Sequence, residues 1–219
     1  CPEARNVSRI SYVEMLVLSS LGAKVLQIRS VEMAMKHGVT VHVRSSFHES
    51  EGTLVTNEDD SLEAIVVAGV ALDRDVARVT IRGVVDQPGL AATLFEALAE
   101  AQVSVDMIIQ NVSADGRTDI TFTVTRSDLA TARPIAEAAL VAQQRGNVVV
   151  DVDLVKVSIV GLGMRSHAGV AAKMFRLLAA ESINLRAIST SEIKVSCLIP
   201  SKYHELAVRA LHDGFGLGS

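Results

Sequence analysis

The sequence contains an internal repeat, and this repeat constrains the fold more than any other feature. The stretch VTIRGVVDQPGLAATLFEALAEAQVSVDMI (79–108) returns as VSIVGLGMRSHAGVAAKMFRLLAAESINLRAI (157–188). The two copies match at an offset of 78 residues before the central loop and of 80 residues after it. The insertion therefore lies in a strand-to-helix loop, where added residues are tolerated best. We predict two copies of one fold.

Each copy predicts the same order of elements. A strand, a loop and a helix are followed by a second strand, a third strand with alternating apolar residues, and a second helix. These later elements are predicted as strands at 103–111 and 183–190, alternating strands at 120–125 and 193–199, and helices at 127–144 and 201–213. One more strand would complete a ferredoxin-like βαββαβ domain. The fold class is therefore predicted as α+β, with two ferredoxin-like domains.

The closing strand has a different source in each copy. The first copy has NVVVDV at 147–152, whereas the second copy is followed by no comparable strand. A further apolar run, EAIVVAGVAL at 63–72, precedes the first copy. We predict that it closes the second domain, so that the first domain (76–152) is inserted into the second (63–72 plus 154–219). The alternative is an ordinary additional edge strand.

The residues before the repeat predict a small helix–helix–strand segment. Ser11 and Glu14 match a capping box at the start of a first helix, and Gly22 is its predicted stop. A second helical pattern covers 23–38, and the following residues alternate like a half-buried strand up to Phe47. The segment 1–47 is too small to be a stable domain alone. Residues 48–62, rich in Ser, Glu, Asp and Gly, predict a linker.

The composition excludes several classes of protein. Apolar residues make up 49% of the chain, and the net charge of −4 lacks the basic clustering of nucleic-acid-binding proteins. Aromatic residues, at 3%, are too few for an RNA-binding sheet. Two cysteines and six scattered histidines predict neither a disulfide framework nor a metal site, and we expect a reducing, cytoplasmic location.

The termini and the hydropathy add two expectations. No apolar run approaches the ~18–20 residues of a membrane span, and no secretory leader is visible. The sequence starts without an initiator Met, so we expect a fragment or a processed product.

Motifs for nucleotide binding and nucleophilic catalysis are incomplete. Gly161 and Gly163 follow a strand, but Ser166 stands where a dinucleotide-binding loop has its third glycine. No phosphate-binding loop and no nucleophile elbow occur in the sequence. His167 is the one histidine placed to touch a ligand, and the alternative is a solvated loop residue.

The strongest candidate site is the start of the first repeat's helix, at DQPG. Pro88 suits a first helical position, and the free N–H groups of a new helix suit an anion such as a carboxylate. Asp86, just outside that helix end, could hold an ammonium group. Gln110 and Asn111 are predicted to lie near Asp86 and to offer side-chain amides. The alternatives are a purely structural turn at Pro88 and Gly89, and a turn-shaping role for Asn111.

Several stretches taken together resemble the C-terminal regulatory part of aspartate kinase (aspartokinase), with its paired ACT domains. They are GAKVLQIRSVEMAMKHGVTVHVRSSF, IIQNVSADGRTDITFTV, GMRSHAGVAAKMF, INLRAISTSEIKVS and ALHDGFGLG. The resemblance covers essentially the whole chain and is greatest to the beta-subunit type. It implies that residues 1–47 are the tail of the catalytic amino-acid-kinase domain. The ATP- and aspartate-binding motifs are missing, so the resemblance implies no cofactor in this chain, with ATP and Mg expected only in a catalytic domain.

The resemblance also implies effector sites where ACT domains pair. The first pocket would be formed by Asp86, Gln87, Pro88, Gly89, Ala91 and Gln110, closed by Asn184 and Leu185 of a partner chain. The second, weaker pocket would be formed by His167, Gly169 and Val170, facing Ser104, Val105 and Asp106. Ala168 and Ser104 depart from the family pattern, and both departures concern the second pocket.

Two functions remain open from the sequence. The first is feedback regulation of aspartate kinase by threonine or lysine, in a homodimer joined through ACT domains and acting on a catalytic domain or alpha subunit. The alternative is a structural subunit that only holds an oligomer together. The sequence does not decide which amino acid binds, and this chain alone is not expected to phosphorylate a substrate.

Overall fold

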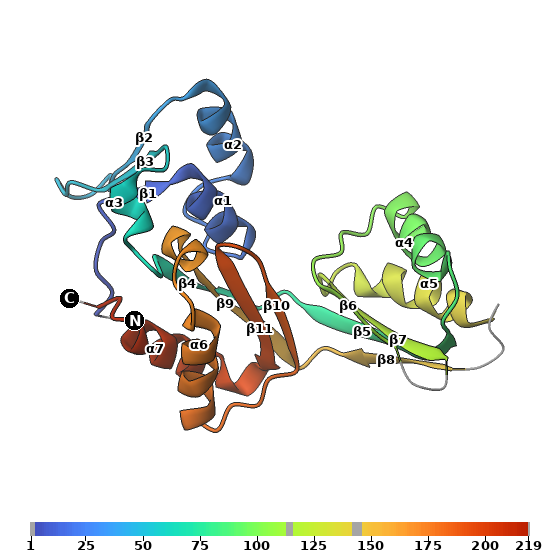
Figure 1. The fold of residues 1–219 in the computed structure, drawn as a ribbon. Coiled ribbons are helices and arrows are strands. Elements are labelled where there is room, and N and C mark those ends of the chain that lie inside the picture. Colours follow the sequence, from blue (N-terminus) through green and yellow to red (C-terminus); the bar gives the residue numbers. More distant parts are fainter. Residues whose placement is uncertain (1–2, 113–115, 142–145, 219) are drawn as a thin grey trace. The chain divides into compact units, whose positions relative to one another are not determined.

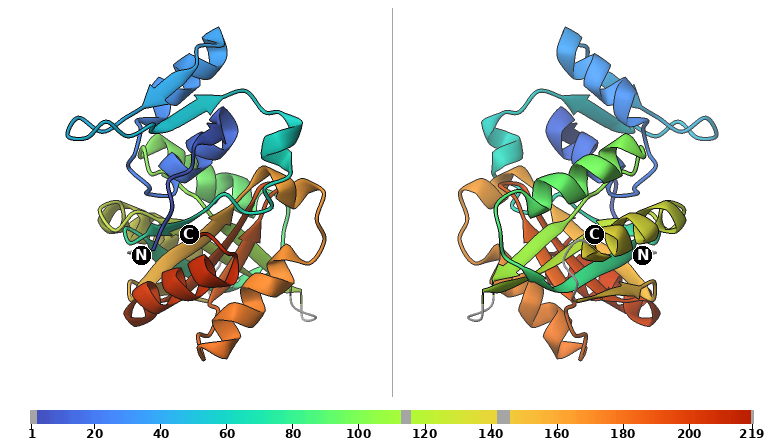
Figure 2. Two further views of the ribbon diagram at one scale, coloured as in Figure 1. Left: turned by 90° about the vertical axis from the view of Figure 1, so that its left-hand side faces the viewer. Right: turned by 90° about the vertical axis from the view of Figure 1, so that its right-hand side faces the viewer.

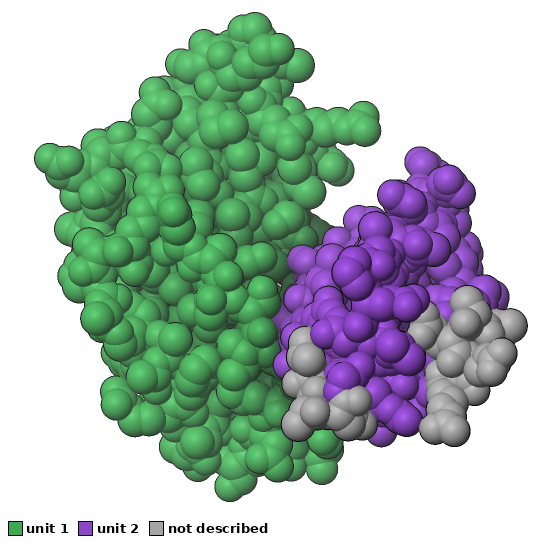
Figure 3. Space-filling view, turned by 45° about the vertical axis from the view of Figure 1, so that its right-hand side comes forward, with its two compact units in different colours: residues 1–74, 155–219 green, residues 75–154 purple. Residues whose placement is uncertain are grey.

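The chain forms two compact units in the computed structural model, which describes residues 3–112, 116–141 and 146–218. Unit 1 combines Cys1–Arg74 with Val155–Ser219, and unit 2 is Asp75–Leu154 (Figure 3). Each unit contains one copy of the repeat and has its own hydrophobic core.

Unit 2 contains the first repeat as a four-stranded antiparallel sheet under two helices (Figure 1). The strand order is β6-β7-β5-β8. The elements are β5 (Ala77–Val85), α4 (Leu90–Glu100), β6 (Ile108–Val112), β7 (Arg117–Val124), α5 (Leu129–Val141) and β8 (Asn147–Asp151). The alternation of β7 places Ile120, Phe122 and Val124 in the core, and the Phe122 ring meets Phe95 edge-on at 5.7 Å between centroids.

The second repeat forms the same arrangement in unit 1, with sheet order β10-β11-β9-β4. Its elements are β4 (Gly69–Asp73), β9 (Leu154–Val160), η1 (Leu162–Arg165), α6 (Val170–Ala180), β10 (Ala187–Thr190), β11 (Lys194–Pro200), η2 (Ser201–Tyr203) and α7 (His204–Gly214). Helices α6 and α7 pack on one face of this sheet (Figure 2). The strand predicted within 63–72 is therefore present as β4, which pairs antiparallel with β9.

Equivalent side chains show that β4 takes the place in one sheet that β8 takes in the other. Arg78 on β5 pairs with Asp151 on β8 at 3.2 Å. At the same position of the repeat, Lys156 on β9 pairs with Asp73 on β4 at 3.3 Å. Both ion pairs join directly opposite residues, which is where cross-strand side chains interact most strongly.

A pair of hydroxyl groups is also repeated between the two sheets. Thr80 and Thr121 share a hydrogen bond of 3.0 Å in unit 2, and Ser158 and Ser196 share one of 2.7 Å in unit 1. These side chains lie on the sheet face opposite the helices, where the alternating pattern had placed polar residues.

Some predicted elements start later than expected. The strands predicted from 103 and 183 begin at Ile108 and Ala187, and each preceding helix is followed by a turn with a left-handed residue, Gln102 (φ 58°) or Ser182 (φ 57°). The second helix of the chain begins at Ile28 rather than at 23. The helix predicted over 127–144 is seen as α5, and 142–145 lie outside the described residues.

The N-terminal segment forms a small three-stranded sheet with order β1-β3-β2 and three helices. Its elements are β1 (Arg9–Ser11), α1 (Tyr12–Ser20), α2 (Ile28–His37), β2 (Val41–Val43), β3 (Thr53–Thr56) and α3 (Asp60–Glu63). The capping box of Ser11 and Glu14 is confirmed. Helix α1 also packs on the second repeat, where Leu21 meets Ala71 and Val160 on the sheet face opposite α6 and α7.

The predicted linker at 48–62 is wrong in two places. Residues 53–56 are β3, the central strand of the N-terminal sheet, and Val55 is fully buried. Asp59 caps α3 by accepting hydrogen bonds from the Ser61 and Leu62 amides. The polar composition hid these elements because β3 depends on a parallel partner, β1, that lies far away in the sequence.

The environment of Asp59 makes this corrected segment testable. Hydrogen bonds from Ser61, and then from Arg9, favour the charged carboxylate and lower the pKa of Asp59 from 3.8 to about 2. Since the pKa of Asp59 is lower in the folded chain, the charged carboxylate stabilises the fold. This stabilisation is fully present above pH 3.8 and is lost as the pH falls through about 2. An NMR titration of the Asp59 carboxyl carbon should give a midpoint near 2. The Ser61→Ala variant should raise it, whereas the exposed Ser30→Ala control should not. A wild-type midpoint near 3.8 would show that this segment is not ordered.

Candidate functional site

The first candidate site, called here the first helix mouth, is the loop 86–89 together with the start of α4. It follows directly from β5. The strand ends at Val85, and α4 begins at Leu90 after the N-cap residue Gly89. The expectation that Pro88 occupies the first helical position is wrong, because it lies two residues before Leu90. Gly89 has φ 93°, a left-handed conformation that delays the start of the helix and that glycine adopts without strain.

This mouth carries free donors next to an exposed acid. Among the described residues, no side chain caps α4, and the one hydrogen bond of the Leu90 amide is a long one of 3.4 Å to the Gln87 carbonyl. The next two helical amides, at Ala91 and Ala92, begin the helix without an earlier turn to bond to. The Asp86 amide donates to the Gly116 carbonyl at 3.0 Å, while its side chain is exposed. The arrangement offers N–H donors for an anion and a carboxyl group for a cation.

Gln110 lies on the edge strand β6, two residues before that strand ends. Both β5 and β6 run antiparallel to β7, so they are parallel and end at one edge of the sheet. Gln110 is paired with Ile120, which is paired with Ile81. Because the Ile120 side chain lies in the core, Gln110 is on the helix-covered face, and it is exposed there. The register sets Gln110 level with Ile81, with β7 between it and β5, so it is further from Asp86 than the sequence suggested.

The loop before α6, called here the second helix mouth, is longer, and its His167 side chain is hydrogen-bonded to other residues of the same loop. The 3₁₀ helix η1 precedes Gly169, which has φ 88° and stands at the N-cap of α6. The His167 ring nitrogen Nδ1 lies 2.8 Å from the Gly163 carbonyl oxygen and 3.2 Å from the Ser166 hydroxyl. Val170 is 9% exposed and belongs to the core. Its side chain is therefore not available to a ligand, and only its amide is.

The predicted pockets each draw on both units. In the first set, residues 86–91 and Gln110 lie in unit 2, while Asn184 and Leu185 lie in unit 1, between α6 and β10. In the second set, 167–170 lie in unit 1, while 104–106 lie in unit 2, between α4 and β6. Their assembly into ligand sites stays a prediction.

The second loop is also held by residues from the N-terminal segment, a feature that the sequence analysis missed. The Leu162 amide donates to Glu14 Oε1 at 2.9 Å, and the Gly163 amide to the Ile65 carbonyl at 3.2 Å. Arg165 Nη1 donates to Glu58 Oε2 at 2.8 Å, and this bond raises the pKa of the guanidinium above its ordinary value. The capping box identified Glu14 locally, but no local pattern connects it to a loop 148 residues away.

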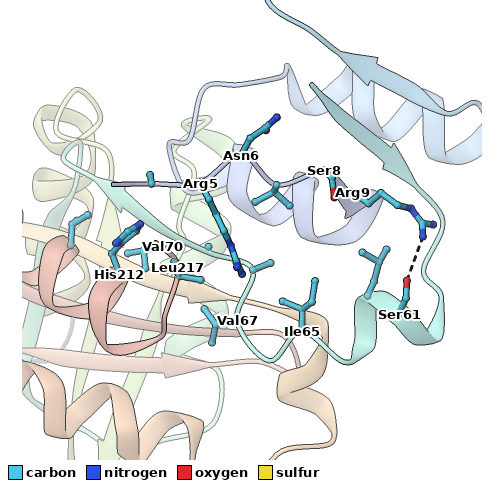
Figure 4. A pocket seen from close by; sticks show the side chains of 16 residues that line it. Arg5, Asn6, Ser8, Arg9, Ser61, Ile65, Val67, Val70, His212 and Leu217 are labelled. Carbon is cyan, nitrogen blue, oxygen red and sulfur yellow. Dashed lines mark hydrogen bonds between the residues drawn. The ribbon is translucent and has the colours of Figure 1, made fainter. Parts of the chain in front are cut away.

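A cavity of about 580 Å³ lies elsewhere in unit 1 (Figure 4). It is bordered by the N-terminal residues 4–9, the segment 61–70 and the end of α7. Arg5 reaches across it toward Val67 and Leu217 (Figure 4), and the other arginine at its rim, Arg9, is paired with Asp59. None of the predicted effector residues borders this cavity.

Among residues 3–112, 116–141 and 146–218, no group of three or more His, Cys, Asp and Glu side chains could hold a metal ion. Cys197 is fully buried, and burial raises the pKa of its thiol to about 12. Within the same described ranges, no helix combines the length and apolar character needed to cross a membrane.

Comparison with known proteins gives the family. A profile of the ACT domain matches residues 79–140 and 157–215, more than half of the chain. A solved chain of the aspartokinase alpha and beta subunits is 51% identical with a TM-score of 0.64, and the match covers 68% of this chain and 99% of that one. This chain belongs to the aspartokinase family.

Within the aspartokinase family, the likeness is to the regulatory part. The regulatory subunit of aspartate kinase from Thermus thermophilus, in its ligand-free form, is 43% identical with a TM-score of 0.65, and is matched over 99% of its length by 68% of this chain. The aspartokinase of Pseudomonas aeruginosa is 51% identical over 218 residues. That match covers 99% of this chain and 53% of the relative, so the chain spans about half the length of such relatives. The predicted α+β fold with two ACT domains is confirmed.

The left-handed residue at the first helix mouth gives a direct test of its geometry. Gly89 has space for a Cβ atom, so the cost of Gly89→Ala comes from the backbone alone. We expect a loss of about 1–2 kcal/mol in the free energy of unfolding, measured with urea. Gly89→Asn is the matched control and should lose less, because asparagine adopts this conformation more readily. An alanine variant as stable as the wild type would contradict the left-handed assignment.

Proposed function

We propose that this chain is a feedback-regulatory region of aspartokinase that binds an end-product amino acid, threonine or lysine, at the first helix mouth. The observation that carries the proposal is the exposed Asp86 carboxyl beside the uncapped N-terminus of α4. A free α-amino acid carries an ammonium and a carboxylate, and these two features match its two charges. The second helix mouth, with no acid at the equivalent position, would bind more weakly or not at all.

The proposed site is completed by a second copy of the chain. Asn184 and Leu185 of the partner would close the pocket formed by Asp86–Ala91 and Gln110, in a homodimer joined through ACT domains. The edge strands β6 and β10 support such an assembly, since each is the last strand of its sheet. Ile108 on β6 and Ile188 on β10 occupy equivalent positions of the repeat and are 55% and 41% exposed. Two edge strands, each paired on one side in the described sheet and carrying equivalent exposed isoleucines, suit side-by-side pairing.

The regulated activity would be that of aspartate kinase, the ATP-dependent phosphorylation of L-aspartate that opens the route to lysine, threonine and methionine in the cytoplasm. Its catalytic domain or alpha subunit would supply the ATP and Mg sites. The N-terminal segment exposes apolar side chains that would suit contact with such a partner. Between 25 and 47 it exposes six large apolar side chains: Val25, Ile28, Met33, Met35, Val39 and Phe47.

The second candidate is a structural subunit whose ACT domains only hold the kinase assembly together. The exposed edge strands favour this function as much as the first, because pairing through β6 and β10 requires no ligand. Binding of an amino acid separates the two candidates.

Calorimetric titration with threonine and then lysine tests the regulatory proposal. We expect saturable binding of one of them. Asp86→Ala should weaken it about ten- to a hundredfold, since hydrogen bonds to charged groups contribute ~1.5–3 kcal/mol. Glu96→Ala removes the same charge from an exposed position on α4 and should bind like the wild type. A folded wild-type chain that binds neither amino acid would favour the structural subunit, and equal losses in both variants would remove Asp86 from the site.

The dimer proposal is tested separately by sedimentation equilibrium. Ile108→Lys and Ile188→Lys place a charge on the two edge strands and should each shift the wild-type dimer toward monomer by at least tenfold in dissociation constant. Val152→Lys is the control, because Val152 is similarly exposed (47%) but follows β8 at the other edge of its sheet. Equal dissociation in all three variants, or a monomeric wild type, would contradict pairing through β6 and β10.

A further inference from the structure

The loop between β9 and α6 differs from its counterpart in what holds its backbone. In the first repeat, Val84 follows Gly83 and is paired with Thr118 of the neighbouring strand. The equivalent residue of the second repeat is Leu162, and its amide donates instead to Glu14 on α1. A residue that is paired within the sheet in one copy thus has its amide bonded to a side chain outside the sheet in the other.

Glu14 uses both oxygens of a buried carboxyl group for this purpose. Its side chain is 1% exposed. Oε2 accepts hydrogen bonds from the Ser11 amide at 3.1 Å and the Ser11 hydroxyl at 2.9 Å, while Oε1 accepts from the Leu162 amide at 2.9 Å. The bond from the Ser11 amide, together with a bond of 3.1 Å from the Glu14 amide to the Ser11 hydroxyl, forms the capping box of α1. The bond from the Leu162 amide is not needed for capping, and it joins α1 to the start of η1.

Two further contacts connect the same loop to residues that precede the repeats. Gly163 donates its amide to the Ile65 carbonyl, and a Cβ atom at this glycine would lie 2.6 Å from the Glu63 carbonyl oxygen. Arg165 is paired with Glu58. The loop therefore has three anchors along its length, and Glu14 is the buried one.

We propose that Glu14 is a positioning residue that ties the second effector loop, 161–169, to helix α1, so that the two open and close as one unit. The tie itself does not depend on the proposed function. Only its role in transmitting a ligand-induced change rests on that function. If an amino acid binds near this loop or across the dimer, Glu14 carries the change to the N-terminal segment. At the first helix mouth, the Asp86 amide is bonded instead to the Gly116 carbonyl of its own unit.

The proposal requires a carboxyl group at this position. A glutamine has one acceptor oxygen and one NH₂ donor, so a donor must face either the Ser11 amide or the Leu162 amide. One of these buried N–H groups is then left without an acceptor, which is costly inside a protein. Glu14→Gln is therefore nearly isosteric and still breaks one side of the link.

Amide hydrogen exchange followed by NMR tests the tie on the full 219-residue chain. In the wild type, the Leu162 amide and the buried amides of α1 should exchange through one opening reaction, with the same dependence on urea. In Glu14→Gln, Leu162 should exchange at least tenfold faster and no longer follow α1. Ser11→Ala is the matched control, because it removes the capping hydroxyl and keeps the Oε1 bond to Leu162. It weakens the cap of α1, so Leu162 and the α1 amides should exchange faster by the same factor and still follow one opening reaction, as judged against the Phe122 amide of unit 2 as an internal reference.

Several outcomes would overturn the tie. Unchanged Leu162 exchange in Glu14→Gln, or Leu162 exchange that stops following α1 in Ser11→Ala although the Oε1 bond is kept, would show that Glu14 does not tie the loop to α1. A second arm adds threonine or lysine. The coupling is supported if the ligand slows hydrogen exchange of the α1 amides in the wild type but not in Glu14→Gln. It is contradicted if the ligand slows this exchange equally in both proteins. If neither amino acid binds, the proposed function fails, while the ligand-free exchange still decides whether Glu14 ties the loop to α1.

Discussion

The antiparallel pairing of β4 with β9 organises most of unit 1. Five residue pairs, from Gly69↔Val160 to Asp73↔Lys156, place a strand that precedes the first repeat at the edge of the second repeat's sheet. The Lys156–Asp73 ion pair joins the two strands at 3.3 Å, with Lys156 only 4% exposed. Since Ala71 of β4 also packs against Leu21 after α1, the N-terminal segment and the second repeat share a core. Unit 2 has a core of its own. The two copies of the repeat therefore form similar domains, and the second one shares a core with the N-terminal segment.

This difference in attachment gives the two helix mouths different tasks in our account. Both helices start after a left-handed glycine with no side-chain cap from the described residues, but the first has an exposed acid, Asp86, beside this end, which suits a site that receives a charged ligand. The second has no acid, and its histidine is bonded to its own loop. Its backbone is held by Glu14 and Ile65, and its arginine by Glu58. Two copies of a repeat can thus divide ligand recognition from transmission of the signal to the N-terminal segment. Coupling between two sites requires a structural element whose equilibrium both sites shift.

The sequence was sufficient for the features that depend on local patterns or on the repeat itself. The alternation of β7 and the capping box of α1 were predicted from local patterns, and the strand within 63–72 was predicted because the second copy of the repeat needs a closing strand. Strand β3 was missed because only a distant partner, β1, makes its few apolar residues a strand. The start of α4 was placed two residues early, since the sequence does not show that Gly89 is left-handed. The Glu14–Leu162 bond was out of reach for the same reason as β3, because it joins positions 148 residues apart.

The central claim is that an amino acid binds at the first helix mouth, and an NMR titration of the labelled chain tests it most directly. With threonine or lysine added, the account predicts saturable shifts in the amides of Gly89–Ala92 and in the side-chain amide of Gln110. Shifts confined to the cavity around Arg5 and His212 would contradict the account, and so would a spectrum that neither amino acid changes.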